Sequence, residues 1–281
     1  MVFVVGVAAA ALLGFGWVLQ QRVAVHSSSS GLMSWSLLRD LIGTWMWWGG
    51  IAAMTAGQSL SAWALQLGPV TLVEPLLVTG LLFAFIVSAI ASHERVRWQE
   101  IVGTVVLCCA LGAFLAVADP RADKHLAPTR PAIIVGAVVI ALVAAGLVAL
   151  GKTVGSLAIE CVLIGLAAGA MYGLQDAATR GAIVAVQHRA VLDLVRTPWP
   201  YVVLAAATAG VLLSQSAFRA GRLDYALPPT TTAQAIAGVL LGIGVLEDQL
   251  SVSGAGIAAE IFSLVALIVG VVLIARSPAF G

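Results

Sequence analysis

The chain has 281 residues, of which 61% are hydrophobic and 10% are charged, and its formal net charge is +1. A soluble domain of this length does not need so much apolar sequence, so the composition predicts an integral membrane protein. A nearly neutral chain with no basic run and no zinc-type ligand spacing gives no reason to expect nucleic acid as a partner. The three cysteines, Cys108, Cys109 and Cys161, lie in apolar segments, where we expect them to pack rather than to form disulfides or bind metal.

Nine segments are long and apolar enough to cross a bilayer as helices, which takes about 20 residues each. In chain order they are residues 2–20, 44–67, 70–92, 101–118, 132–150, 157–175, 200–218, 229–246 and 254–275. No basic residue precedes the first apolar run, so it is interpreted as a membrane helix and not as a secretory signal. The two longer polar stretches, 22–43 and 180–199, are expected to be amphipathic connectors, with a re-entrant functional segment as the alternative.

A duplication relates the two halves of the chain. An offset of 153 residues, without a gap, pairs Pro75 with Pro228 and Glu94 with Glu247. Matched prolines in a chain that has only ten are harder to attribute to composition than matched alanines or leucines. The same offset relates spans two to four to spans seven to nine, and an offset of 155 relates span one to span six.

Each copy therefore holds four helices, and the fifth span lies between the copies. Because four helices alone would keep both copies in the same direction, the unpaired fifth helix turns the second copy upside down. The predicted fold is an all-α polytopic membrane protein with an inverted four plus one plus four repeat. Its parts are a first repeat in 1–118, a linker with the fifth span in 119–155, and a second repeat in 156–281.

Positive charges give a weak indication of orientation. Eight Lys and Arg residues lie on the side that holds the C-terminus and the loops after spans one, three, five and seven, against six on the other side. The excess predicts a cytoplasmic C-terminus and an external N-terminus, in a plasma or inner membrane. A small excess is what dual-topology ancestry would leave.

Two matched prolines indicate where a binding site would lie. A proline inside a helix frees a backbone carbonyl, here near Thr71 and near Asp224, and interrupted helices at matching places in two inverted halves are typical of transporter binding sites. We expect Pro75 and Pro228 to face each other across the centre. The alternative is that these prolines only begin their helices.

Three acids lie at membrane depth, where an ionisable side chain is costly. Glu74, Asp176 and Glu260 are predicted to fall toward the same, outer leaflet, with no buried Lys or Arg to match them. Such an acidic region suits a cationic substrate, a metal ion or a coupling proton, and Glu74 and Glu260 are the candidate metal ligands. For Asp176 the alternative is an i,i+4 pair with Arg180, and a structural role stays open for the other two.

Polar uncharged side chains complete the candidate binding site. They occur in or at the ends of spans in both copies, where they line a pathway or join helices by hydrogen bonds. The candidates are Gln20, Gln58, Gln175, Ser214 and Gln215.

The motifs resemble a known family of transporters. The run Gly68-Pro69-Val70-Thr71-Leu72-Val73-Glu74-Pro75-Leu76, with Glu94, Gly103 and their counterparts in the second copy, resembles the drug/metabolite transporter (EamA-like) superfamily over nearly the whole chain. Together with Trp47, Trp48 and Gly57, it is most similar to the branch of NIPA-type magnesium transporters, which also have nine spans. This chain has Gln58 where that branch commonly has an acid, and Glu74 where it has a threonine or similar residue.

The resemblance implies a secondary active transporter that moves a small, cationic solute by alternating access, such as a divalent metal ion like magnesium or a cationic metabolite or drug. No cofactor and no catalytic constellation is expected, so an enzyme is the least favoured class. The rival hypothesis is a non-transporting membrane subunit, or a lipid-handling protein that stabilises a partner complex. The expected partners are the lipid bilayer and the solute, and a homodimer or a membrane-protein partner stays open.

Overall fold

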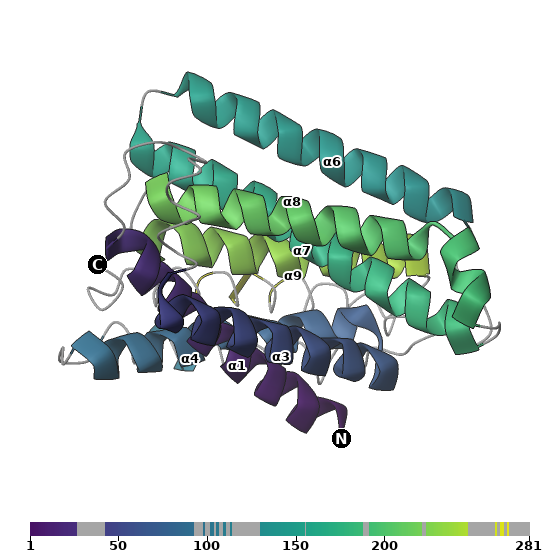
Figure 1. Cartoon of the computed structure of the whole chain (residues 1–281), viewed down its shortest axis with the longest axis horizontal. Helices are drawn as coiled ribbons and strands as arrows, with labels where there is room; N and C mark the ends of the chain where they lie inside the picture. The colour runs from purple at the N-terminus through teal and green to yellow at the C-terminus, as the bar shows by residue number, and fades with distance from the viewer. Residues whose placement is uncertain are drawn as a thin grey trace.

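The structure is a computed structural model in which every described element is a helix (Figure 1). It describes residues 1–26, 43–92, 130–154, 156–187, 191–220 and 223–246, with a few single residues between 98 and 113 and between 262 and 269. The helices are α1 (Val2–His26), α3 (Trp45–Leu67), α4 (Val70–Ser92), α6 (Arg130–Thr153), α7 (Leu157–Gln187), the 3-10 helix η1 (Val191–Arg196), α8 (Trp199–Ala220) and α9 (Leu223–Leu246).

Six of these helices are long and apolar enough to cross a membrane: α1, α4, α6, α7, α8 and α9. The protein is therefore an all-α chain of the multi-pass membrane type, but the described helices do not reach the nine predicted spans. Helix α3 has the length, 23 residues, but carries more polar side chains. The predicted spans 101–118 and 254–275 lie mostly outside the described residues.

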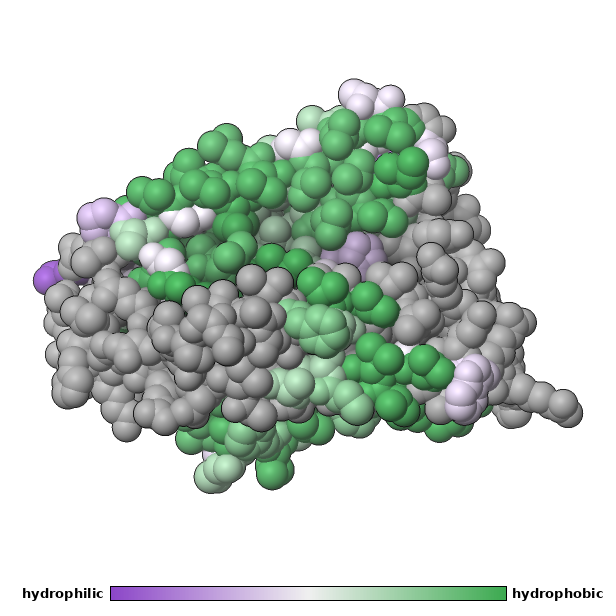
Figure 2. All heavy atoms as spheres, turned by 180° about the vertical axis from the view of Figure 1, so that it is seen from behind, coloured by the Kyte–Doolittle hydropathy of each residue, from purple (hydrophilic) through white to green (hydrophobic). Residues whose placement is uncertain are grey.

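The described surface is largely apolar, as contact with lipid requires. Helix α6 is the extreme case, because only 11% of its candidate span is buried inside the protein. Figure 2 shows hydrophobic side chains over most of the described surface on the face opposite to that of Figure 1. An exposed apolar face of this extent is costly in water and is satisfied by the hydrocarbon of a bilayer.

Both matched prolines lie inside continuous helices. Pro75 is within α4, which begins at Val70, and Pro228 is within α9, which begins at Leu223. Both prolines thus lie inside a helix, as predicted, but neither interrupts it, and the alternative that they begin their helices is wrong. In α9 the hydroxyl of Thr231 donates to the carbonyl of Leu227 at 3.2 Å, a local side-chain bond within the segment that the prolines affect.

The same packing arrangement occurs twice. Helix α1 packs along α3 and α4, and helix α7 packs along α8 and α9. Figure 1 shows these as two groups, with α1, α3 and α4 below and α6 to α9 above. In each group the first and third helices run in the same direction, as their contacts show: Gly6 with Leu76, Gly14 with Gly80, Gly165 with Ala226, and Gly173 with Gln234.

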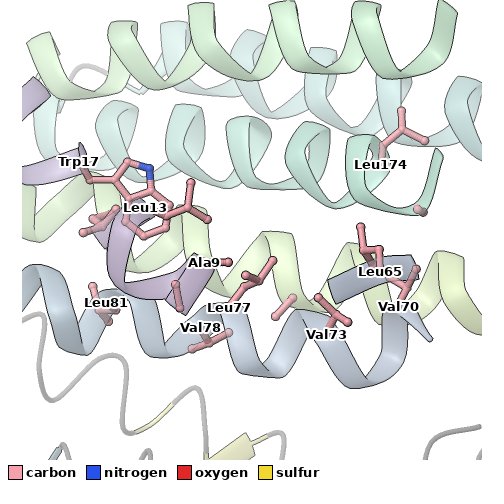
Figure 3. Packing of buried hydrophobic residues seen from close by; sticks show 14 of the residues in the cluster. Ala9, Leu13, Trp17, Leu65, Val70, Val73, Leu77, Val78, Leu81 and Leu174 are labelled. Carbon is pink, nitrogen blue, oxygen red and sulfur yellow. The ribbon is translucent and has the colours of Figure 1, made fainter. Parts of the chain in front are cut away.

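Glycines allow these parallel pairs to approach closely. A Cβ on Gly14 would collide with the backbone carbonyl of Gly80, and a Cβ on Gly169 would collide with that of Thr230. The two glycines are related by the offset of 155 residues. Around the first contact, Ala9, Leu13 and other apolar residues of α1 pack against α4 (Figure 3).

The contacts also give the relative directions of the two groups. Helix α3 runs opposite to α1, because Gly50 lies against Gln20 and Gly57 against Leu13. Helix α3 runs in the same direction as α7, as is shown by the bonds of Gln58 to Asp176 and of Arg180 to the carbonyl of Leu65. Helices α1 and α7, which the sequence offset relates, therefore run in opposite directions.

Candidate functional site

A cavity of about 280 Å³ lies between α1, α3, α7, α8 and α9. Its wall combines apolar side chains with hydroxyls and amides, and none of the described residues that line it is charged. The lining residues are Leu13, Trp17, Gln20, Ile51, Met54, Thr55, Gln58, Tyr172, Gln175, Ala207, Val211, Ser214, Gln215 and Gln234.

The wall of the cavity is built from equivalent positions of the two copies. The offset of 155 relates Trp17 to Tyr172 and Gln20 to Gln175, and both members of each pair line the cavity. The offset of 153 does the same for Met54 with Ala207 and for Gln58 with Val211. The cavity thus lies where the two groups of helices meet.

An amide pair joins α1 to α8 at one end of the cavity. The Nε2 of Gln215 donates to the Oε1 of Gln20 at 3.1 Å. Gln20 is 1% exposed, and its own Nε2 has no hydrogen-bond partner among the described residues. An unused buried donor costs free energy unless a ligand or water accepts from it.

A second cluster, here called the Asp176 cluster, joins α3, α7 and α9. Gln58 donates from Nε2 to Oδ1 of Asp176 at 3.3 Å, and Gln234 donates from Nε2 to Oδ2 at 2.9 Å. Asp176 is 2% exposed and lies behind these two amides, which line the cavity. Because Gln58 and Gln234 both turn their amide nitrogens to Asp176, the carbonyl oxygens of the two amides are directed away from that acid.

Arg180 bonds to backbone carbonyls at the end of a neighbouring helix. Its guanidinium donates to the carbonyls of Leu65, at 2.5 Å, and of Gln66, at 3.4 Å, in the last turn of α3. The carboxylate oxygens of Asp176 hold the amides of two other helices. Both side chains thus bond to neighbouring helices, and the i,i+4 pair between them stays an alternative.

Two contacts join the two groups of helices: the Gln20–Gln215 bond and the Asp176 cluster, here called the two closures. They lie at different depths along α3. Gln20 is level with Gly50, and Gln58 follows Gly50 by two helical turns. At 1.5 Å per residue the Gln20–Gln215 bond and the Asp176 cluster are about 12 Å apart along the helix axis. A small molecule between them would have polar side chains near both of its ends.

Glu74 lies next to this cluster but does not line the cavity. Its side chain is fully buried, and neither carboxyl oxygen has a hydrogen-bond partner among the described residues. It packs against the backbone of Gly238 in α9, where any Cβ would collide with it, and it is near enough to Asp176 for the two carboxyls to interact. A buried acid without hydrogen bonds is costly, and such groups are retained mainly at functional sites.

The structure brings together most of the residues predicted from sequence. Gln20, Gln58, Gln175, Ser214 and Gln215 all line the cavity. Glu74 and Asp176 lie beside it as a pair, whereas Glu260 lies outside the described residues. Within the described part of the chain, no group of three or more His, Cys, Asp or Glu could hold a metal ion, so the expected pairing of Glu74 with Glu260 stays a prediction.

The two prolines do not face each other. Glu74, beside Pro75, lies level with Gly238, and Pro228 is ten residues earlier in α9, about 15 Å along the axis. Since α4 and α9 each carry the proline near their own beginning, an antiparallel crossing separates the two residues. Neither Pro75 nor Pro228 lines the cavity.

Aromatic residues of the site were missed in the sequence. Trp17 and Tyr172 both line the cavity, and the hydroxyl of Tyr172 accepts a hydrogen bond from Ser214 at 3.1 Å. The signal that indicates them is the offset of 155 residues, which places an aromatic side chain at this position in both copies. Gln234, which the sequence offers as one more amide within a span, also lines the cavity, but its bond to Asp176 could not be predicted because nothing in the sequence pairs the two residues.

Comparison with known proteins yields one informative relative. The chain is 27% identical over 273 residues to an uncharacterized protein of Corynebacterium glutamicum, covering 96% of this chain and 93% of the relative. The similarity extends over both copies of the predicted repeat. No protein-family model matches the chain, and no solved structure matches it.

Proposed function

We propose that this protein is a secondary active membrane transporter of the drug/metabolite type, which moves a small solute by alternating access. The observation that carries the proposal is the cavity between two groups of helices, which has an apolar wall with amides and hydroxyls in it and, at each end, side chains that bond from one group to the other. Transporters built from inverted repeats place their binding sites at such an interface.

The proposed architecture is nine spans in an inverted four plus one plus four repeat. Three observations support it: helices α1, α3 and α4 pack as α7, α8 and α9 do, the related helices α1 and α7 run in opposite directions, and α6 lies in the chain between the groups. Helix α3 is the second span in this proposal. Segments 101–118 and 254–275 would supply the fourth and ninth.

The two closures are also related by this arrangement. The Gln20–Gln215 bond joins α1 to α8, and the Gln58–Asp176 bond joins α3 to α7, so each links the first helix of one copy to the second of the other. Hydrogen bonds between membrane helices contribute about 0.6 kcal/mol on average. Bonds of this strength break readily, so rocking of one group on the other would open one end while the other stays closed.

The acidic pair has a separate role in this proposal. Glu74 and Asp176 lie behind the amides of Gln58 and Gln234 and not in the cavity wall. In this proposal the two carboxyls bind a coupling proton or a coupling cation. Alternatively, their negative charge favours a cationic solute in the cavity. Magnesium as the cargo, which the resemblance implies, would need oxygen ligands that the described wall supplies only from amides and hydroxyls.

A single cysteine at the cavity wall tests alternating access without knowledge of the cargo. In a variant with Cys108, Cys109 and Cys161 replaced by alanine, Ala207→Cys would report whether the cavity is reached from each side of the membrane. We expect a membrane-impermeant maleimide to modify it from both sides in oriented vesicles. Modification from one side only would contradict the proposal and favour a non-transporting membrane subunit.

A further inference from the structure

The cavity offers different chemistry at its two ends. At one end the Nε2 of Gln20 is a buried donor without a partner. At the other end Gln58 and Gln234 have both turned their nitrogens to Asp176, so what they direct away from the acid is carbonyl oxygen. A ligand that satisfies both ends needs an acceptor for Gln20 and N–H donors for Gln58 and Gln234.

The wall between the two ends is apolar and aromatic. Leu13, Trp17, Ile51, Met54 and Val211 line the cavity together with the ring of Tyr172. Such a wall favours the burial of hydrocarbon and disfavours a bare or hydrated metal ion. The aromatic faces of Trp17 and Tyr172 would also favour a cationic group near them.

The electrostatics of the second end specify the sign of the ligand's charge. Two amides that donate to the same carboxylate are polarised by it, which makes their carbonyl oxygens stronger acceptors. The Asp176 end is thus complementary to an ammonium group, which carries three N–H donors. The Gln20 end is complementary to a carbonyl.

We propose that the cargo is an elongated organic cation: an ammonium group at the Asp176 cluster, an apolar middle against Trp17 and Tyr172, and a carbonyl acceptor at Gln20. The separation of the two ends, about 12 Å along the helix axis, suits a molecule whose ammonium and carbonyl lie at opposite ends of a single ring or a short chain. The inference rests on the proposed transport function, because it names the cargo of that same cavity.

Binding to purified full-length protein in detergent tests this assignment. The probe is 4-(aminomethyl)benzamide, which carries both end groups on one ring, and the comparison compounds are benzylamine, which lacks the carbonyl, and 4-methylbenzamide, which lacks the ammonium. By titration calorimetry we expect the probe to bind about tenfold more tightly than either comparison compound, as the loss of one good hydrogen bond implies. Equal affinities, or binding of Mg²⁺ but not of the probe, would overturn the proposal.

Variants of Gln20 assign the carbonyl to its end of the cavity. In Gln20→Leu the advantage of the probe over benzylamine should disappear, whereas in Gln66→Leu, an exposed glutamine of α3, it should persist. If Gln20→Leu does not fold, Gln20→Met serves instead, because it is unbranched, of similar length to glutamine and has no N–H donor. Unchanged discrimination in a variant that still binds benzylamine would overturn the assignment.

The outcomes distinguish a wrong cargo from a wrong function. Binding in detergent does not depend on alternating access, which the Ala207→Cys modification reports separately. Tight binding of the probe with one-sided modification would support the ligand class and contradict transport. Two-sided modification with no binding of the probe would leave transport supported and overturn the ligand class.

Discussion

The buried acid Glu74 is the residue at which the two copies differ most. The equivalent position in the second copy is Leu227, which is 1% exposed and part of the hydrophobic core. A leucine there stabilises the helix packing, whereas Glu74 is fully buried and its polar neighbour is another buried acid, Asp176. Such a group reduces stability, and a protein keeps it where function requires it.

Glu74→Leu should therefore stabilise the fold. Leucine removes a desolvated acid, and replacing buried ionic groups by well-packed apolar residues raises the free energy of unfolding by about 1–4 kcal/mol in favourable cases. We expect a higher thermal unfolding temperature in detergent, followed by tryptophan fluorescence. The same variant should no longer carry out coupled transport.

The reciprocal change is the matched control. Leu227→Glu places an acid at the equivalent position of the second copy, where Leu227 packs in the core, and should lower the unfolding temperature. A fall in stability of Glu74→Leu as well would show that Glu74 has a structural partner. The contrast between the copies would then have no functional meaning.

At the scale of helices, the close crossings depend on glycine. Helices α1 and α4 cross at Gly14, and helices α7 and α9 cross at Gly169, both against backbone carbonyls of the partner helix. Backbone atoms cannot move aside as a flexible side chain can. The crossings therefore leave no room for a methyl group.

Gly169→Ala should destabilise the second group of helices. Overpacking of a close-packed contact costs about 1–3 kcal/mol, and it should appear as a lower unfolding temperature and as aggregation on size-exclusion chromatography after heating.

Gly146→Ala in α6 is the control, because a Cβ there meets no atom within 4 Å among the described neighbours. It should be neutral or slightly stabilising, since alanine favours helix over glycine. If both variants lowered the unfolding temperature by a similar amount, the effect of Gly169→Ala could not be assigned to the close helix crossing.

The helices follow the apolar segments of the sequence closely, and the departures have physical causes. Helix α4 has the predicted bounds, but α7 continues to Gln187, twelve residues past the predicted end of its span. Hydropathy falls at Asp176 and Arg180, yet the helix continues because both side chains find partners on α3. Helix α9 likewise begins at Leu223, ahead of the prolines that were expected to interrupt or begin it.

The site could be predicted only in part, for a related reason. Polar side chains in apolar spans are visible in the sequence. The predicted residues Gln20, Gln58, Gln175, Ser214 and Gln215 do line the cavity. The place of Glu74 against Gly238 depends on the crossing of α4 with α9, which no local pattern specifies. The distance between the prolines depends on the same crossing.

For the whole molecule, the two closures connect cavity chemistry to motion. Each links one group of helices to the other, and they lie about 12 Å apart along α3. In a rocking molecule, weakening one closure should favour the conformation that is open at that end. The two ends face opposite sides of the membrane if α3 spans it.

Variants of the two closures should therefore shift access in opposite directions. Gln215→Leu removes the donor to Gln20, and Gln58→Leu removes one of the two donors to Asp176. In the Ala207→Cys background, each should raise the rate of maleimide modification from one side of the membrane and lower it from the other. A loss of about 0.6–1.4 kcal/mol in one closure shifts a two-state equilibrium by about three- to tenfold.

The signs of the two changes are what test the mechanism. Gln66→Leu replaces an exposed glutamine of the same helix as Gln58 and should leave both rates unchanged. Were both closure variants to raise modification from the same side, the closures would lie on one side of the cavity and could not alternate. Opposite shifts would instead require that the two groups of helices exchange one open end for the other, because a rigid molecule has no means of lowering access at the distant end.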